Sequence, residues 1–362
     1  MRMMRKVENN MSNTKLHWEN LPASSLQRGS QRAADWDRLC TAGGNLPFLS
    51  SDAVISALEI LGDRRERLLA ATDGSRVRAM FILAPAGQFR WATFQPSQLP
   101  LGAWVADSDL LLGKLARSLL KGPLGFCLVL SVTQVDPMVA PRPADAPDSH
   151  TGDYIETGWV DIQGSFEDYW ASRGKNLRQN MRKQRSKMQA EGIVASMEVL
   201  RGQEDMATAI DRYGQLESAG WKAQEGTALH LDNAQGKFYT ELLQQSSQRG
   251  EAVVYQYRFD DRVVAMNLCL QRNGVLVVLK TTYDESIQYY SPAFLLRESE
   301  MQAFHAEGLI RRVEYYGRLM DWHTKLTSEK RTLYHLTLYR WPLVRRLAES
   351  RRMKAVAQAQ ES

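Results

Sequence analysis

The sequence predicts an α/β protein of two similar halves, each with a mixed, mostly antiparallel sheet flanked by helices. The order hairpin, strand, helix, strand occurs twice, over residues 68–132 and again over residues 252–316. Between them, residues 137–147 hold four prolines in eleven positions. Because proline lacks an amide proton and has a fixed φ, this stretch is neither helix nor central strand. We therefore expect a linker at 137–150 and two sheets that pack against each other.

The first half is expected to span residues 46–136, after a polar N-terminal arm at 1–45 that holds only a short helix near Asp35–Leu39. Apolar runs separated by a glycine turn predict a hairpin, and leucines at helical spacing predict a helix. The predicted elements are the helix Ala53–Leu61, the strands Leu68–Thr72, Val77–Ala84 and Phe89–Phe94, the helix Asp109–Leu120 and the strand Phe126–Val132.

The second half is expected to span residues 151–340 and to carry the chemistry, followed by a basic tail at 341–362. A Ser cap, an Asn-Gly turn and glycines after two helices delimit its elements. These are the strand Tyr154–Ile162, a helix from Phe166, a basic helix within 173–187, the strand Ile193–Leu200, the helices Glu204–Ser218 and Gly236–Arg249, the strands Ala252–Phe259, Val263–Gln271 and Val275–Tyr283, the helix Pro292–Glu307, and the strands Arg311–Tyr316 and Leu333–Leu338.

Composition excludes several classes of protein. The three cysteines, Cys40, Cys127 and Cys269, are widely spaced and form no Cys-x-x-Cys or Cys/His cluster, so the sequence predicts neither a metal site nor a disulfide framework. No apolar run approaches the ~20 residues of a membrane span, and the polar N-terminus does not resemble a signal peptide. We expect a cytoplasmic protein. Motifs of serine hydrolases, zinc proteases and P-loop nucleotidases are absent.

One strand–helix–strand unit predicts an anion site. Ser291 and Pro292 suit the N-cap and first position of a helix, where unpaired amides and the helix dipole attract phosphate. The amides of Ala293 and Phe294 are the expected donors. Asp284 closes the preceding strand, so its side chain should lie near the helix start.

Two residues further along are expected at the same place. Tyr315 lies on the returning strand, and Lys325 follows ten positions later, far enough to fold back over the opening. We therefore expect Asp284, Ser291, Tyr315 and Lys325 to converge on one cleft. A lysine there would screen the negative charge of a bound phosphate. The alternative for Lys325 is a surface ion pair with Asp321 at i,i+4.

This order of residues resembles the GNAT superfamily of acyltransferases, in particular its cellulose-biosynthesis (CelD/BcsL-like) group, which is related to the FemABX aminoacyl transferases. The stretches that carry it are Tyr290 to Leu296, Glu314 to Gly317 and Asp321 to Lys325. The resemblance implies tandem GNAT-like domains. It also implies transfer of an acyl group from acyl-CoA, or another acyl thioester, to an amine of a sugar, a polyamine or an amino-acid derivative. In that reaction Asp284 would accept the proton of the amine, Tyr315 would protonate the leaving group and Lys325 would screen a phosphate or the oxyanion.

The resemblance also suggests further site residues. Trp221, Lys222 and Asp321 would bind the acceptor, a small molecule or glycan precursor, and strand amides within 279–282 would stabilise the oxyanion. GNAT enzymes carry a glycine-rich phosphate loop, whereas this chain has Gln288 to Ala293 without glycine. The donor therefore stays open between acyl-CoA, an acyl-carrier protein and aminoacyl-tRNA. Aminoacyl transfer and a non-catalytic accessory role in polysaccharide biosynthesis remain alternatives.

Two segments are strongly basic. Residues 173–187 hold seven cations and no acid, so we expect Arg178, Arg182 and Arg185 to face the cleft and the donor; the alternative is a solvated helix face. The tail at 341–362 mixes arginines with Trp341 and leucines. It would lie on an anionic membrane surface or, alternatively, dock as a terminal helix.

Overall fold

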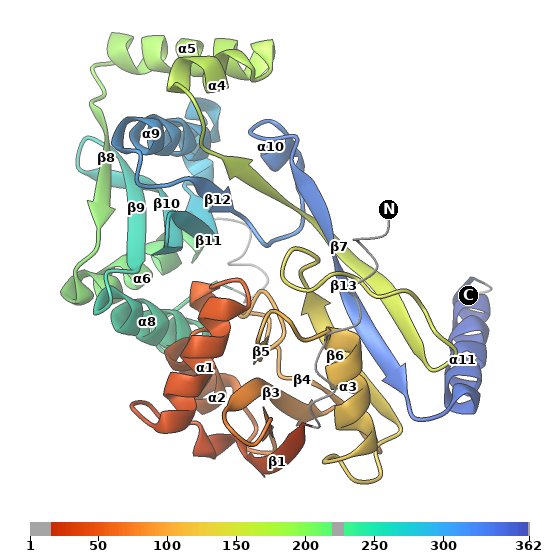
Figure 1. The fold of residues 1–362 in the computed structure, drawn as a ribbon. Coiled ribbons are helices and arrows are strands. Elements are labelled where there is room, and N and C mark those ends of the chain that lie inside the picture. The colour runs from red at the N-terminus through yellow and green to blue at the C-terminus, as the bar shows by residue number, and fades with distance from the viewer. Residues whose placement is uncertain (1–15, 219–227, 361–362) are drawn as a thin grey trace, which may run out of the picture.

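The strands of the molecule form one continuous sheet. The computed structural model describes residues 16–218 and 228–360 (Figure 1). Its thirteen-stranded sheet has the order β1-β2-β3-β4-β6-β13-β7-β12-β11-β10-β9-β8, with β5 paired to β3. Only β4–β6 and β11–β12 are parallel among these pairs. The mixed, mostly antiparallel α/β fold is therefore confirmed.

Two groups of elements flank two long connecting strands. The first group is β1 (His17–Pro22), η2 (Ala23–Ser25), α1 (Gln31–Ala42), η3 (Pro47–Leu49), α2 (Ser51–Leu61), β2 (Arg67–Thr72), β3 (Val77–Pro85), β4 (Arg90–Thr93), β5 (Trp104–Ala106), α3 (Leu112–Lys121) and β6 (Val129–Val135). The second group is α4 (Phe166–Ala171), α5 (Lys175–Ala190), β8 (Ala195–Leu200), α6 (Gln203–Ser218), α8 (Ala234–Ser247), β9 (Ala252–Phe259), β10 (Arg262–Arg272), β11 (Val275–Tyr283), η4 (Glu285–Tyr290), α9 (Pro292–Glu307), β12 (Arg312–Glu314) and α10 (Asp321–Thr324).

The connecting strands are β7 (Ser149–Asp161) and β13 (Lys330–Tyr339), and the chain ends in α11 (Pro342–Gln360). Most of β7 pairs with β13, whereas its last three residues pair with β12. Figure 1 shows β7 and β13 running side by side between the two groups. The expectation of two separate sheets is therefore wrong, because one strand of thirteen residues is long enough to belong to both.

The expected boundaries also need correction. Residues 17–45 are not an arm: β1 pairs with β2, and α1 buries Trp36 and Leu39 in the core. The expected linker at 137–150 already contains the start of β7. The strand β13, expected in the second half, pairs with β6 of the first group. Pairing between strands that are distant in sequence leaves no pattern in the local sequence, which is why the expected boundaries were wrong.

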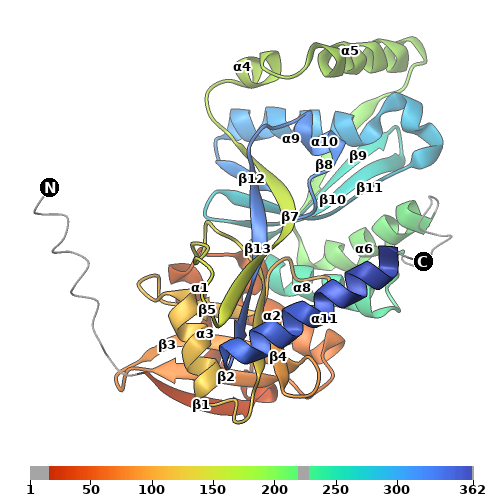
Figure 2. The ribbon, with the colours of Figure 1, turned by 90° about the vertical axis from the view of Figure 1, so that its right-hand side faces the viewer.

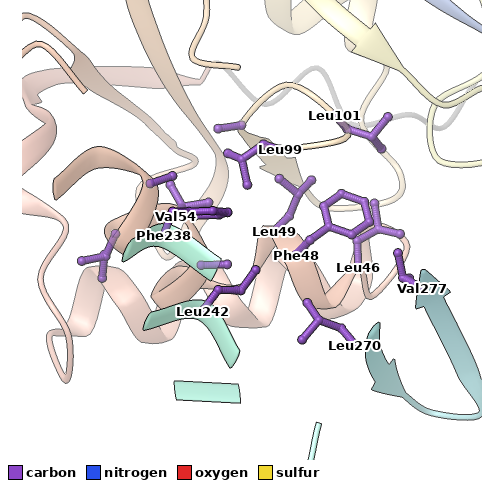
Figure 3. Close-up of a cluster of buried hydrophobic side chains, with 14 of the residues drawn as sticks. Leu46, Phe48, Leu49, Val54, Leu99, Leu101, Phe238, Leu242, Leu270 and Val277 are labelled. Atoms are coloured by element: carbon purple, nitrogen blue, oxygen red, sulfur yellow. The ribbon is translucent and has the colours of Figure 1, made fainter. Parts of the chain in front are cut away.

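A shared hydrophobic core joins the two groups. Figure 3 shows Phe48, Leu49 and Val54 beside Phe238 and Leu242 of α8 and near Leu270 and Val277 of the second sheet region. The Phe48 ring also meets the Tyr316 ring edge-on at 5.1 Å. Because this apolar surface is buried from both sides, the groups are expected to unfold together.

A buried ionic network lies at the same junction. Arg331 of β13 contacts Asp136 at 2.7 Å and Glu314 of β12 at 2.9 Å, and all three side chains are buried. Burial raises the pKa of Glu314 to about 7. No described helix is long and apolar enough to cross a membrane. Within residues 16–218 and 228–360, no cluster of His, Cys, Asp and Glu is arranged to hold a metal ion.

Candidate functional site

The second sheet region opens between two parallel strands. The ladder between β11 and β12 covers only three pairs and ends at Val277 and Glu314. Beyond that point β11 continues to Tyr283 with β10 as its only partner among the described strands, while Tyr315 donates its amide to the Gly158 carbonyl on β7 at 3.2 Å. No other described strand pairs with the edge of β11 that faces this opening beyond Val277. This is the edge expected to supply oxyanion donors.

The equivalent place in the first group is closed. There β4 and β6 also pair in parallel over three residues. Just beyond, the hydroxyls of Thr93 and Thr133 hydrogen-bond at 2.7 Å, and the Gly102 amide donates to the Thr133 carbonyl at 3.2 Å. A Cβ at Gly102 would lie 2.5 Å from Thr93 Oγ1, so the strands meet tightly. The opening between β11 and β12 is the candidate site for this reason.

A polar cavity of about 720 Å³ lies at the start of α9. Its lining includes Arg173, Asn176 and Asn180 from the α5 region, Ser291 and Phe294 of the α9 start, and Lys325. The Lys325 Nζ lies 5.3 Å from the centre of the Phe294 ring. The described residues include no carboxylate paired with Lys325, so the expected alternative pair with Asp321 does not form. Two cations next to a helix N-terminus suit an anionic group.

The backbone at this helix start offers few free amides. Ser291 occupies the N-cap position with a left-handed φ of 57°, but its hydroxyl accepts from Asn180 Nδ2 at 3.2 Å and does not cap the helix. The Phe294 amide donates to the Ser291 carbonyl at 2.9 Å, so it is not available to a phosphate as expected. Among the described groups, none accepts from the Ala293 amide. The 3₁₀ turn η4 occupies the place of a glycine loop.

The basic helix presents a different face from the expected one. Arg178 donates to the Arg173 carbonyl at 3.1 Å, and Arg182 is exposed outside the cavity lining. Arg185 forms an ion pair of 2.8 Å with the buried Glu298 of α9. Successive helical residues are rotated by about 100°, so the asparagines and not these arginines face the start of α9. The expectation that the three arginines face this cavity is wrong.

Asp284 lies outside the cavity at the start of α9. Asp284 is buried, pairs with Arg262 and accepts the Ser286 amide at 3.0 Å, which caps η4. It lines a separate cavity with Arg262 and Arg258. Its strong local pairing leaves no accessible base, so the four expected residues do not share one cleft.

Tyr315 is buried at the opening itself. Its ring lies 5.4 Å from the Trp322 ring and 4.8 Å from the His323 ring, and burial raises the pKa of its hydroxyl far above the usual range. His323 Nδ1 accepts the Met320 amide at 2.9 Å, and burial lowers the pKa of His323 to about 4. The imidazole is therefore neutral at physiological pH. Asp321 starts α10 on the surface, while Trp221 and Lys222 lie outside the described residues.

A buried charge that the sequence analysis missed adjoins this opening. Arg297 of α9 donates to Thr281 Oγ1 on β11 and to the Ala293 carbonyl, each at 2.8 Å. Its guanidinium lies 4.0 Å from the centre of the Trp322 ring and forms no ion pair with a described carboxylate. Burial lowers the pKa of this guanidinium. The signal was a run of charges, Arg297, Glu298 and Glu300, directly after the apolar first turn of this helix.

A second cavity, of about 440 Å³, lies where the opening meets the first group of elements. Its lining includes Val278 and Leu279 of β11 and the tyrosines 315 and 316. The other described polar side chains that line it are Gln95, Ser97, Gln98, Gln134, Tyr154, Tyr239 and Arg318. Amides, hydroxyls and one cation, with no carboxylate among the described lining residues, suit a neutral or anionic ligand.

Comparisons with known proteins agree with this geometry. Residues 175–325 match the family model of the acetyltransferase (GNAT) domain, a segment that contains β11, α9, β12 and Lys325. A search among curated proteins returned no significant match.

Solved structures share the fold over most of the chain. FemX has a TM-score of 0.57 at 9% identity, with 89% of this chain and 97% of FemX covered. The C-terminal domain of a candidate lysylphosphatidylglycerol synthetase from Agrobacterium fabrum has a TM-score of 0.53 at 15% identity, with 84% and 92% covered. A protein of unknown function from Bacteroides thetaiotaomicron has a TM-score of 0.52 at 8% identity, with 85% and 97% covered.

Proposed function

We propose that this protein transfers an acyl group from an acyl thioester, with acyl-CoA as the first candidate, to the amine of a sugar or an amino-acid derivative. One observation carries the proposal: β11 and β12 separate after three pairs, with a cationic cavity at the start of α9 and a second cavity at the opening. The donor's phosphate would lie near Arg173 and Lys325. The acceptor would lie beside Tyr154 and Arg318.

The reaction needs a stabilised oxyanion. The amine nitrogen attacks the thioester carbonyl, the carbon–sulfur bond breaks, and the amine proton leaves to water. Negative charge develops on the carbonyl oxygen, which would lie near the edge of β11 that faces the opening and near the guanidinium of Arg297, which contacts Thr281 on that strand. Prearranged donors in a dry site typically contribute the largest part of such catalysis. The hydroxyl of Tyr315, whose raised pKa keeps it protonated, would donate a hydrogen bond to the leaving thiolate, and water would return the proton that the thiolate takes up.

The residues that line the acceptor cavity make a polyamine a poor candidate acceptor. A polyamine carries several positive charges and would need carboxylates, but there are none among the described residues that line the cavity. Tyrosine rings and glutamine amides instead suit hydroxylated or amide-bearing groups, and Arg318 suits a carboxylate or phosphate on the acceptor. We therefore place sugar and amino-acid derivatives ahead of polyamines.

Aminoacyl-tRNA is the second candidate donor, because the start of α9 offers the Ala293 amide alone. A pyrophosphate is usually held by several backbone amides of a glycine-rich turn. One free amide with the cations of Arg173 and Lys325 suits a single phosphate, as in the terminal nucleotides of a tRNA or the prosthetic group of an acyl-carrier protein. The lack of a glycine-rich phosphate loop is also compatible with a non-catalytic accessory role, which the experiment below tests.

The test combines donors and acceptors. Purified protein is incubated with short and long acyl-CoAs, an acylated carrier protein or aminoacyl-tRNA, each with amino sugars, amino acids and polyamines, and amide products are identified by mass spectrometry. We expect acyl-CoA-dependent product with an amino sugar or amino acid, abolished by Leu279→Trp, which fills the opening. Leu231→Trp, at an exposed position, is the control.

Each other outcome changes the assignment. Product from aminoacyl-tRNA alone replaces the first candidate by the second. Transfer that survives Leu279→Trp places the reaction outside the opening. No transfer from any donor, together with no rise in melting temperature on adding them, indicates an accessory protein.

A further inference from the structure

We propose that one end of the first group of elements binds the surface of an anionic membrane. Five apolar side chains gather there with exposed fractions between 44% and 64%. These residues, called the aromatic patch below, are Phe89, Phe126, Trp341, Leu343 and Leu347. Exposed apolar side chains scattered singly are normal, whereas a contiguous group marks an interaction surface.

The patch is assembled from three distant segments. Phe89 lies between β3 and β4, Phe126 lies between α3 and β6, and Trp341 precedes α11. The Phe126 ring lies 5.1 Å from the Phe89 ring and 6.4 Å from the Trp341 ring. Figure 2 shows α11 along the outer side of the molecule, beside the strands of this group. The rings are thus held together by the fold.

Arg340 supports this arrangement. It donates to the carbonyls of Leu120 and Gly125 at 3.1 Å, and its guanidinium lies 6.0 Å from the Phe126 ring and 5.6 Å from the Trp341 ring. These contacts connect the loop before β6 to the end of β13. A surface that is prearranged in this way loses little conformational entropy when it binds.

Charge identifies the occupant. Residues 340–354 carry six cations and one acid, a net charge of +5 that equals the formal charge of the whole chain. Arg346 and Arg351 are exposed beside the patch, whereas Arg345 is engaged with the Ser149 carbonyl and Glu349. Tryptophan and phenylalanine next to arginines on a helix suit the headgroup region of an anionic bilayer.

Other occupants fit less well. Two copies of this chain would bring two segments of like charge together, which opposes self-association. A nucleic acid would satisfy the arginines but would leave Leu343 and Leu347 in water. An anionic lipid surface satisfies both the charge and the apolar side chains. This inference does not depend on the proposed acyl transfer.

The experiment is co-sedimentation of the full chain with vesicles. One set contains phosphatidylcholine only, and the other contains phosphatidylglycerol as well. We expect binding to the second set, with little binding to the first. The double variant F126S/W341S should bind at least about tenfold more weakly, and R346E/R351E should lose at least about fivefold for each charge replaced.

Controls keep these outcomes distinct. Leu309→Ser changes an equally exposed apolar residue after α9 and should leave vesicle binding unchanged. Melting temperatures should stay within a few degrees, because the replaced side chains are exposed. Unchanged binding by F126S/W341S, equal binding to both vesicle sets, or a dimer that F126S/W341S dissociates would each overturn the proposal. So would preferential binding of an RNA oligomer that is insensitive to F126S/W341S.

Discussion

Asn267 of β10 donates a hydrogen bond of 2.7 Å to Glu300 of α9 in the interior of the second group of elements. Both side chains are buried, and the Asn267 Oδ1 has no donor among the described groups. Burial raises the pKa of Glu300 to about 7, against an ordinary value of 4.5. A proton on this carboxyl group removes a buried charge and can supply the missing donor. The pair therefore links the stability of α9 to pH.

Glu300→Gln should change the pH dependence of stability. The native state holds this proton up to about pH 7, whereas the unfolded chain releases it near pH 4.5. The wild-type free energy of unfolding therefore falls as pH rises between those values. The variant should lack part of this fall and be the more stable protein near pH 8. Denaturant titrations across this range measure it, with Glu307→Gln as the exposed control on the same helix. Parallel curves for Glu300→Gln and wild type would contradict the assignment.

Arg297→Met should separate stability from activity. The buried guanidinium has no carboxylate partner among the described residues, and replacing such a charge by an apolar side chain of similar length is often neutral or stabilising. We expect an unchanged or higher melting temperature. If the charge stabilises the oxyanion, kcat should fall about 100- to 1000-fold. A variant that folds and retains full kcat would exclude Arg297 from the chemistry.

Lys325→Ala should weaken donor binding. The lysine lines the cavity at the start of α9, and a charge-assisted contact to phosphate contributes about 1.5–3 kcal/mol. The KM for the donor should therefore rise about tenfold or more with little change in kcat. Steady-state kinetics with varied donor gives the split. Lys330→Ala, which removes an exposed lysine paired with Glu156, is the control. A fall in kcat with no change in KM would indicate that Lys325 stabilises the oxyanion and does not bind the donor's phosphate.

Arg331→Ala should destabilise the whole molecule in a single transition. The change leaves the buried Asp136 without its arginine and leaves Glu314 with the longer contact of 3.7 Å to Arg312, and breaking a buried ion pair typically costs about 3–5 kcal/mol. Below about pH 7 the loss should be smaller, because Glu314 is then protonated in the native state. Circular dichroism and tryptophan fluorescence should report coincident unfolding. Two separated transitions would show that the two groups fold independently.

The sequence by itself determined the local elements around the site. The turn Asn273-Gly274 joins β10 and β11 with positive φ at both residues, 48° and 77°, because asparagine and glycine adopt that conformation readily. The helix Pro292–Glu307 and the strand Val275–Tyr283 have the predicted bounds. Proline suits the first helical position, and Gly308, with a left-handed φ of 67°, ends the helix. These capping and turn signals depend on a few neighbouring residues, so they can be recognised in the sequence alone.

The tertiary structure decided which groups meet. β13 pairs with β6 across about half of the chain, and β7 serves both parts of the sheet. Asp284 forms an ion pair with Arg262 and lies outside the expected cleft. Arg297 lies in the interior and donates a hydrogen bond to Thr281. Strand partners and ion pairs depend on the relative placement of distant segments. That placement is set by the burial of the shared core, which no local pattern of residues encodes.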